Sequence, residues 1–128
     1  MKKIIRSVNA PAPVGPYSQA VAAGNILFVA GQIALDPVSG KMVNHDISSE
    51  TRRVMENLKA ILLEAGLAME DVVKCTIFLH DLSNFTEVNE VYGEYFPDEP
   101  PARETVEVGR LPVDARVEIS CIAIADGR

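Results

Sequence analysis

The sequence predicts an α+β domain in which a mixed six-stranded sheet carries two helices on one of its faces. Residues 104–108 and 116–124 alternate between apolar and polar side chains, which is the period of a half-buried strand. Two other segments repeat apolar residues at helical spacing, and each follows strand-like sequence. A chain of 128 residues is long enough to bury one core. We therefore expect residues 1–128 to form a single domain.

The first predicted strand covers residues 3–7 and leads into an extended loop. Residues 9–16 carry three prolines and one glycine, a composition that excludes regular structure. This loop presents Tyr17 and Ser18 to their surroundings.

A hairpin follows, with predicted strands over residues 17–23 and 26–33 joined by a tight turn at residues 24–25, Gly-Asn. Gly31 lies inside the second strand of this hairpin. A glycine there indicates a bulge or a close approach by another group, and a simple packing glycine is an equally good interpretation.

The first helix is expected to begin near Ser48 or Ser49, either of which can cap it. Its apolar face repeats at helical spacing and comprises Val54, Leu58, Ile61, Leu62 and Ala65. Gly66 should end it. Residues 71–79 are rich in β-branched and apolar side chains, which predicts a central strand.

The second helix is predicted from about Phe85 to Phe96, where Pro97 ends it. Asn84 followed by Glu87 is close to a capping box. The expected buried stripe comprises Phe85, Val88, Tyr92, Tyr95 and Phe96. Asn89 lies beside this stripe, so it either bonds to solvent or points into a pocket. Taken alone, the pattern favours the solvent-bonded interpretation.

Two more strands close the chain. Pro100 and Pro101 keep the preceding residues extended, so Arg103 lies at the start of a strand and shares a face with Thr105 and Glu107. Gly, Pro and Asp residues within 109–115 predict a loop.

The last strand has two distinct faces. Val117, Ile119, Cys121 and Ala123 form an apolar face, and Arg116, Glu118 and Ser120 form a polar one. We expect this strand and the one before it to be adjacent. A guanidinium and a carboxylate on adjacent strands would suit a small carboxylate substrate that needs acid–base help.

Composition excludes several classes of protein. The net charge of −6 and the pI of 4.8 argue against binding nucleic acid through a basic face. Cys75 and Cys121 lie in apolar runs, which favours free buried thiols and a reducing, cytoplasmic location. The first residues lack the continuous apolar core of a signal peptide, and no run is long enough to span a membrane.

The residues also narrow the chemistry. His45 and His80 stand in no ligand spacing with each other or with the cysteines, so we expect no metal. No glycine-rich phosphate motif is present, and no histidine is suitably placed to activate Ser18 as a nucleophile. Arg, Glu, Tyr and backbone groups remain. They can hold and hydrate a small carboxylate-bearing electrophile without a cofactor.

Four ordered segments resemble the RidA/YjgF family of reactive-intermediate deaminases. They are Ala-Pro-x-Pro-Val-Gly-Pro-Tyr-Ser-Gln-Ala at 10–20, Phe-Val-Ala-Gly-Gln-Ile at 28–33, Phe-Thr-Glu-Val-Asn-Glu-Val-Tyr at 85–92, and Pro-Ala-Arg-x-x-Val-x-Val-x-x-Leu-Pro-x-x-Ala-x-Val-Glu-Ile at 101–119. The resemblance covers nearly the whole chain. It implies a chorismate-mutase-like fold and a homotrimer in which the sheets pack into a central barrel and the active sites lie between subunits.

The resemblance also implies an activity. Enzymes of this family hydrolyse 2-imino acids, such as 2-iminobutanoate and 2-iminopropanoate, to 2-oxo acids and ammonia without a cofactor. This protects pyridoxal-phosphate enzymes from damage. By the same resemblance, Arg103 clamps the substrate carboxylate, and Glu118 positions the attacking water and shuttles protons. The residues implied to line the pocket are Tyr17 and Asn89, with backbone groups at Gly31 and Thr105.

Two departures from the family pattern bear on substrate preference. Glu104 and Thr105 stand where many members have Ser-Cys, and Ala30 stands where many have Ser. Alternative functions are a non-catalytic binder of small carboxylates such as 2-oxo acids, or a regulatory trimer. An endoribonuclease or translation inhibitor is a weaker alternative because the chain is acidic and lacks a histidine pair.

Purely structural roles also remain open for the site residues. Arg103 can pair with Glu104 or Glu107, and Glu118 can pair with Arg116 or Arg110. Tyr17 can equally be a core aromatic residue.

Overall fold

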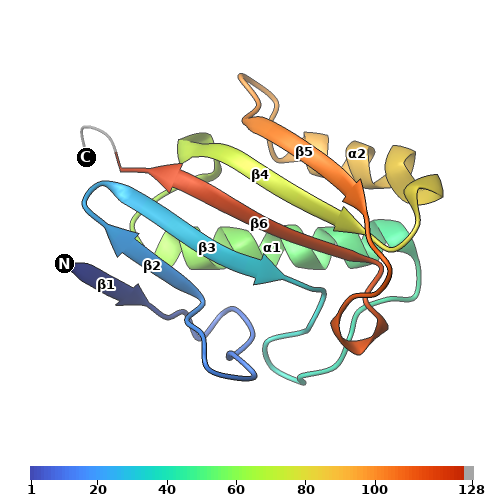
Figure 1. The fold of residues 1–128 in the computed structure, drawn as a ribbon, viewed down its shortest axis with the longest axis horizontal. Coiled ribbons are helices and arrows are strands. Elements are labelled where there is room, and N and C mark those ends of the chain that lie inside the picture. The colour runs from blue at the N-terminus through green and yellow to red at the C-terminus, as the bar shows by residue number, and fades with distance from the viewer. Residues whose placement is uncertain (126–128) are drawn as a thin grey trace.

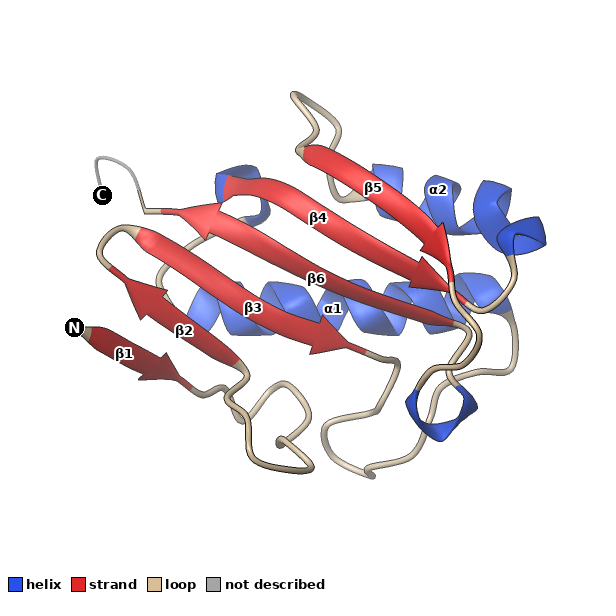
Figure 2. Cartoon of the chain, in the orientation of Figure 1, coloured by secondary structure: helices blue, strands red, loops and turns tan. Residues whose placement is uncertain are grey.

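The computed structural model describes residues 1–125, which build one six-stranded sheet with two helices against one face (Figures 1 and 2). The strands are β1 (Lys2–Ile5), β2 (Ala20–Ala23), β3 (Ile26–Gln32), β4 (Val72–Leu79), β5 (Ala102–Glu107) and β6 (Val117–Ile124). Their order across the sheet is β1-β2-β3-β6-β4-β5. Among the described residues, only the β4–β5 pair of this sheet is parallel. The predicted fold class, a mixed sheet with both helices on one face, is confirmed.

The expectation that β5 and β6 are adjacent is wrong, because β4 lies between them. A parallel pair needs a crossover, and α2 (Phe85–Glu94) supplies it between β4 and β5. The chain then returns over residues 108–116 and inserts β6 between β3 and β4, antiparallel to both.

Helix α1 (Ile47–Glu64) begins slightly earlier than predicted. Its N-cap is Asp46, whose carboxylate accepts a hydrogen bond of 2.7 Å from the Ser49 backbone N–H. In the first turn the fully buried Glu50 accepts hydrogen bonds from the backbone and side chain of Arg116, at 2.8 and 2.7 Å. This ion pair ties α1 to the start of β6.

Helix α2 lacks the predicted capping box, because the Asn84 side chain makes no capping hydrogen bond. A turn over Leu82–Asn84 leads into the helix instead, and the Asp81 carboxylate accepts from the Ser83 backbone N–H at 2.8 Å. The buried stripe also differs from the prediction. Val91 is buried, whereas Phe85 lies partly exposed at the edge.

The core lies between the helices and the inner face of the sheet. Strand β6 alternates as predicted: its inner face is buried against α1, and its outer face carries Glu118 and Ser120 followed by Ile122 and Ile124. Cys75 and Cys121 face each other across β4 and β6 in this core as free thiols, and burial raises the pKa of both.

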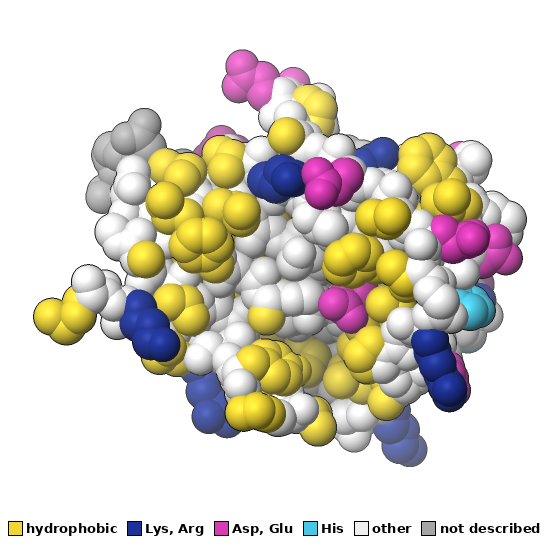
Figure 3. All heavy atoms as spheres, viewed as in Figure 1, with side chains coloured by type: hydrophobic (Ala, Val, Ile, Leu, Met, Phe, Trp, Pro, Cys, Tyr) yellow, Lys and Arg dark blue, Asp and Glu magenta, His cyan; other side chains and the backbone are white. Residues whose placement is uncertain are grey.

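The outer face of the sheet has no helix over it. A row of apolar residues crosses it from β1 to β6, namely Ile4, Val21, Phe28 and Ile122. Ile4 and Phe28 are about half exposed. Figure 3, which looks onto this side, shows hydrophobic side chains gathered over the strands. The described residues therefore leave an apolar sheet face without an intrachain cover.

Candidate active site

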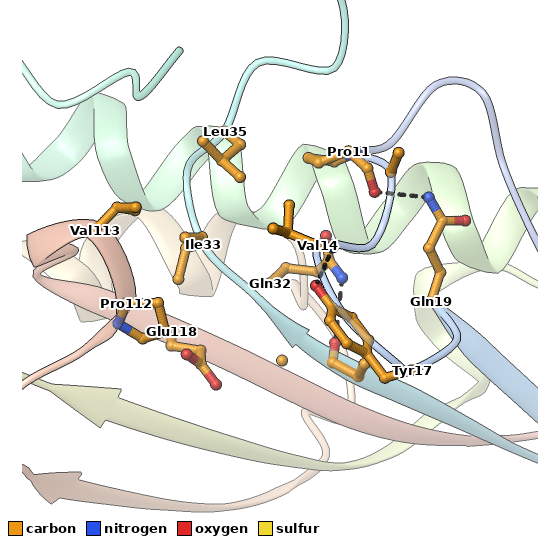
Figure 4. A pocket seen from close by; sticks show the side chains of 13 residues that line it. Pro11, Val14, Tyr17, Gln19, Gln32, Ile33, Leu35, Pro112, Val113 and Glu118 are labelled. Carbon is orange, nitrogen blue, oxygen red and sulfur yellow. Dashed lines mark hydrogen bonds between the residues drawn. The ribbon is translucent and has the colours of Figure 1, made fainter. Parts of the chain in front are cut away.

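A cavity of about 480 Å³ opens where the loop after β1, the end of β3 and the turn before β6 meet (Figure 4). It is lined by Pro11, Ala12, Val14, Tyr17, Gln19, Ala30, Gly31, Gln32, Ile33, Leu35, Pro112, Val113 and Glu118. The cavity thus brings together three of the residues singled out in the sequence, Tyr17, Gly31 and Glu118.

Gly31 allows the Glu118 carboxyl group to lie against the backbone of β3. A Cβ atom at position 31 would stand 2.9 Å from the carboxyl carbon of Glu118 and closer still to Oε2. The register of β3 against β6 also shifts between Val29 and Gln32, which marks a bulge at the same place. The bulge and the close approach are therefore both present, and a side chain at position 31 would displace the Glu118 carboxyl group.

Glu118 has no hydrogen-bond or ion-pair partner among the described residues. The two cations considered as partners are engaged elsewhere: Arg116 binds Glu50, and Arg110 binds Asp114 at 3.2 Å. Partial burial raises the pKa of the Glu118 carboxyl group by desolvation. The result is a half-buried carboxylate whose lone pairs are available to water or a ligand.

Tyr17 is not a core residue, since 51% of it is exposed. Its ring lines the cavity, and its hydroxyl oxygen accepts a hydrogen bond of 3.3 Å from the Val14 backbone N–H. Figure 4 shows Tyr17 and Glu118 facing the same space from the loop and from β6.

The loop that carries Tyr17 is held by Gln19, which the sequence reasoning missed. The buried Gln19 amide accepts from the Ser7 backbone N–H at 2.6 Å and donates to the carbonyl oxygens of Ser7, Ala10 and Pro11. In the sequence, the only feature that could have identified Gln19 is its position as a polar residue directly before an apolar strand. These hydrogen bonds fix one wall of the cavity.

A second cluster surrounds Arg103 on β5. Its Nη1 donates a hydrogen bond of 2.6 Å to Asn89 Oδ1. The guanidinium carbon lies 5.0 Å from the ring centroid of Tyr92 and 5.5 Å from that of Phe85. Asn89 is thus bonded to Arg103, an interaction that neither interpretation of its position included.

Arg103 does not pair with the neighbouring glutamates. Glu104 binds Lys74 at 3.1 Å, and Glu107 accepts from the Leu82 backbone N–H at 2.9 Å. Thr105 lies two residues from Arg103, and its hydroxyl is buried without a hydrogen-bond partner in the described chain.

Phe85 and Tyr92 are further residues of this cluster that sequence reasoning did not assign to the site. They stand four residues before and three residues after Asn89, which places all three on one side of α2. Aromatic residues at this spacing around a polar one are the signal that could have identified them.

One chain does not bring Arg103 and Glu118 together. Arg103 pairs in register with the buried Cys75, so its side chain lies on the helix-covered face of the sheet. Glu118 pairs with Phe78 on the outer face. The two groups therefore lie on opposite faces, with β4 between their strands.

Residues 1–125 contain neither a cluster of metal ligands nor a membrane-spanning helix. Nowhere in this range do three His, Cys, Asp or Glu side chains gather in a way that suits a metal ion. None of its helices is both long and apolar enough to cross a membrane.

Comparison with known proteins gives consistent matches along the chain. The family model described as Endoribonuclease L-PSP matches residues 7–125. A RutC family protein of Pyrococcus horikoshii is 54% identical over 123 residues, which are 96% of this chain and 98% of that protein. Reactive Intermediate Deaminase A, chloroplastic, of Arabidopsis thaliana is 44% identical over 122 residues, 95% of this chain and 65% of that protein. The crystal structure of E. coli TdcF with bound serine has a TM-score of 0.92 at 41% identity and covers 95% of this chain and 98% of its own.

Proposed function

Because the chain belongs to the family described as Endoribonuclease L-PSP, whose members include a reactive intermediate deaminase, we propose that it hydrolyses reactive 2-imino acids to 2-oxo acids and ammonia. The resemblance to the RidA/YjgF family is thereby confirmed. The proposed substrates include 2-iminobutanoate and 2-iminopropanoate, and their removal would protect pyridoxal-phosphate enzymes. The observation that carries the proposal is the half-buried Glu118 carboxylate, which has no partner in residues 1–125 and whose pKa is raised.

Arg103 is proposed to bind the substrate carboxylate. A guanidinium offers five N–H donors in a planar fork that matches a carboxylate. One nitrogen of Arg103 is held by Asn89, and the rings of Phe85 and Tyr92 restrict the plane of the group. The remaining donors are available for a bidentate contact.

Glu118 is proposed to act as the general base. Its carboxylate accepts a proton from a water molecule while the water oxygen bonds to the imine carbon, and it passes this proton to the imine nitrogen to give a carbinolamine. Glu118 then accepts the proton of the new hydroxyl group and transfers it to the nitrogen as the carbonyl forms and the C–N bond breaks. The products are a 2-oxo acid and ammonia, which accounts for every atom of the imine and the water.

A complete site would need two subunits. Arg103 and Glu118 lie on opposite faces of the same sheet, so no small substrate can reach both within one chain. We therefore place the site between subunits of a homotrimer, with Tyr17, Gly31 and Glu118 from one subunit and Arg103, Asn89 and Thr105 from the next. The uncovered apolar sheet face provides the surface for this assembly.

The direct test is a competition assay. 2-Iminobutanoate is generated in situ from an amino acid in the presence of semicarbazide, and the adduct is followed with and without the protein. The protein should suppress adduct formation, whereas Arg103→Ala should not. An intact trimer that fails to suppress the adduct at any practical concentration would refute the proposal.

The second candidate is a non-catalytic binder of small carboxylates. The related TdcF structure contains bound serine, a small molecule with a carboxylate, and this favours keeping the candidate. Glu118→Gln separates the two functions: a deaminase loses turnover but still binds 2-oxobutanoate, whereas a binder has no turnover to lose. The description of the family as endoribonuclease is not favoured for this chain, because its net charge of −6 opposes binding to phosphates.

A further inference from the structure

The wall of the Glu118 cavity is apolar beyond what a small imino acid requires. Pro11, Val14, Ile33, Leu35 and Pro112 contribute hydrocarbon surface, and Ala30 presents a methyl group. Most of the polar side chains in the wall already make hydrogen bonds within the chain. The Gln19 amide bonds to backbone groups, and Gln32 Nε2 donates to the Ala30 carbonyl oxygen at 3.4 Å. Glu118 and the Tyr17 hydroxyl are the polar groups left to a ligand.

The rim of the cavity contains a valine held in a conformation that valine rarely adopts. In the turn Pro112–Asp114, Val113 has a φ of +48° and Asp114 a φ of +56°. Left-handed backbone is unfavourable for a β-branched residue and tends to persist at functional sites. The turn is closed by a 3.0 Å hydrogen bond from the Ala115 N–H to the Pro112 carbonyl oxygen and by the Arg110–Asp114 ion pair.

This strained turn projects an apolar side chain to the edge of the cavity instead of burying it. Val113 is 64% exposed and lines the cavity. Val14, from the loop that carries Tyr17, is 83% exposed and also lines it. In one chain these two valines leave hydrocarbon surface at the mouth of the cavity, and the part that the next subunit of the proposed trimer leaves open is the part that a bound ligand can cover.

A 2-imino acid has three parts, and two of them are already placed under the proposed function. The carboxylate goes to Arg103 and the imine to Glu118. The side chain of the substrate must then occupy the remaining surface, which is apolar. A one- or two-carbon side chain would leave most of that surface wet, whereas a branched aliphatic side chain would cover it.

We infer that the preferred substrates are 2-imino acids with larger aliphatic side chains, such as the imine of leucine. Val113 and Val14 determine this specificity. The inference rests on the proposed function. Each methylene that becomes buried should raise kcat/KM about fourfold. The imine of leucine, with three more side-chain carbons than that of alanine, should therefore be preferred roughly 50-fold.

The test measures kcat/KM for imines generated in situ from alanine, 2-aminobutyrate and leucine by an amino-acid oxidase, with semicarbazide competing. Val113→Asn keeps a residue that tolerates left-handed backbone and removes the apolar contact. The preference for the leucine imine over the alanine imine should fall about four- to sixteenfold in this variant, as for one or two lost methyl contacts. Val14→Ser should act in the same direction. The matched control is Val38→Asn, because Val38 is 95% exposed and does not line the cavity.

The outcomes are distinguishable. If no imine is hydrolysed, the proposed function fails. If all imines are hydrolysed but kcat/KM is level or falls with side-chain length, only the specificity inference fails. A preference for the leucine imine that survives both Val113→Asn and Val14→Ser would remove the two valines from the inference.

Discussion

At Glu118 the local environment decides the chemistry of an ordinary carboxyl group. The side chain lies against the Gly31 backbone, with no cation bound to it in the described residues, and desolvation raises its pKa. A carboxyl group with a raised pKa is a stronger base when ionised, which suits it to accept a proton from water.

This shift predicts the pH dependence of activity. In the proposed mechanism the ionised form is the general base, and the raised pKa keeps the group protonated up to a higher pH than an ordinary glutamate. As pH falls, kcat/KM should therefore decline with an apparent pKa above the usual 4.5. Initial rates of imine hydrolysis between about pH 4 and 8 would measure this limb. A limb at or below 4.5 would show that Glu118 is not the titrating base.

The same shift carries a stability prediction for Glu118→Gln. Because folding raises this pKa, the ionised carboxylate destabilises the fold at pH values above the folded pKa, and the penalty disappears below the unfolded value. The variant should therefore melt at a slightly higher temperature than the wild type at about pH 7, and this gain should vanish near about pH 4. Scanning calorimetry at the two pH values tests the sign.

Gly31 provides a second prediction for a single residue. Gly31→Ala places a methyl group against the Glu118 carboxyl, so either the side chain moves or the strands separate. We expect a loss of about 1–3 kcal/mol in the free energy of unfolding, typical of overpacking, and a larger loss of turnover. The control is Gly93→Ala in α2, where nothing lies within 4 Å of the added Cβ. Urea unfolding that leaves Gly31→Ala as stable as the wild type would contradict the steric argument.

At the scale of the element, α2 positions the guanidinium group of Arg103. Phe85, Asn89 and Tyr92 reach the guanidinium from one side of the helix, while β5 delivers Arg103 from the edge of the sheet. The parallel β4–β5 pairing requires a crossover, and the helix that supplies it also orients Arg103, the proposed carboxylate-binding residue.

Removing the Asn89 amide should therefore weaken ligand binding more than folding. Hydrogen bonds to charged groups contribute about 1.5–3 kcal/mol, so Asn89→Ala should raise the Kd for 2-oxobutanoate at least about tenfold. Titration calorimetry measures the effect, with Glu90→Ala on the exposed side of α2 as control. Equal affinities for the two variants would mean that Asn89 does not position Arg103.

At the scale of the whole molecule, the strand order separates the two proposed halves of the site within one chain. The two proposed halves of the site lie on opposite faces, and the outer face carries exposed apolar residues such as Ile4 and Phe28. Both features are accounted for if subunits pack through this face and one subunit completes the site of the next.

Mixing two inactive variants tests this arrangement. Arg103→Ala and Glu118→Gln should each lack turnover. After unfolding and refolding together in equal amounts, about a quarter of the interfaces should combine an intact Arg103 with an intact Glu118, with recovery of about a quarter of wild-type activity. The variants refolded separately are the control. Activity that stays absent in mixed trimers, shown to form by native mass spectrometry, would place both residues in the same subunit's site.

The sequence by itself determined most of the elements and their faces. The strict alternation of β6 and the helical spacing of α1 appear in the structure nearly as predicted, because both depend on side chains a few residues apart. Element ends were less accurate. Asp46, not a serine, caps α1, since whichever nearby oxygen reaches the free N–H groups takes that role.

The tertiary structure alone decided the relations between distant residues. It placed β4 between β5 and β6, set Arg103 and Glu118 on opposite faces, and brought Glu118 against Gly31. No local pattern encodes these choices, because strand order follows from how the whole chain buries its apolar faces. The proposal that a second subunit completes the site rests on that order and not on any single motif.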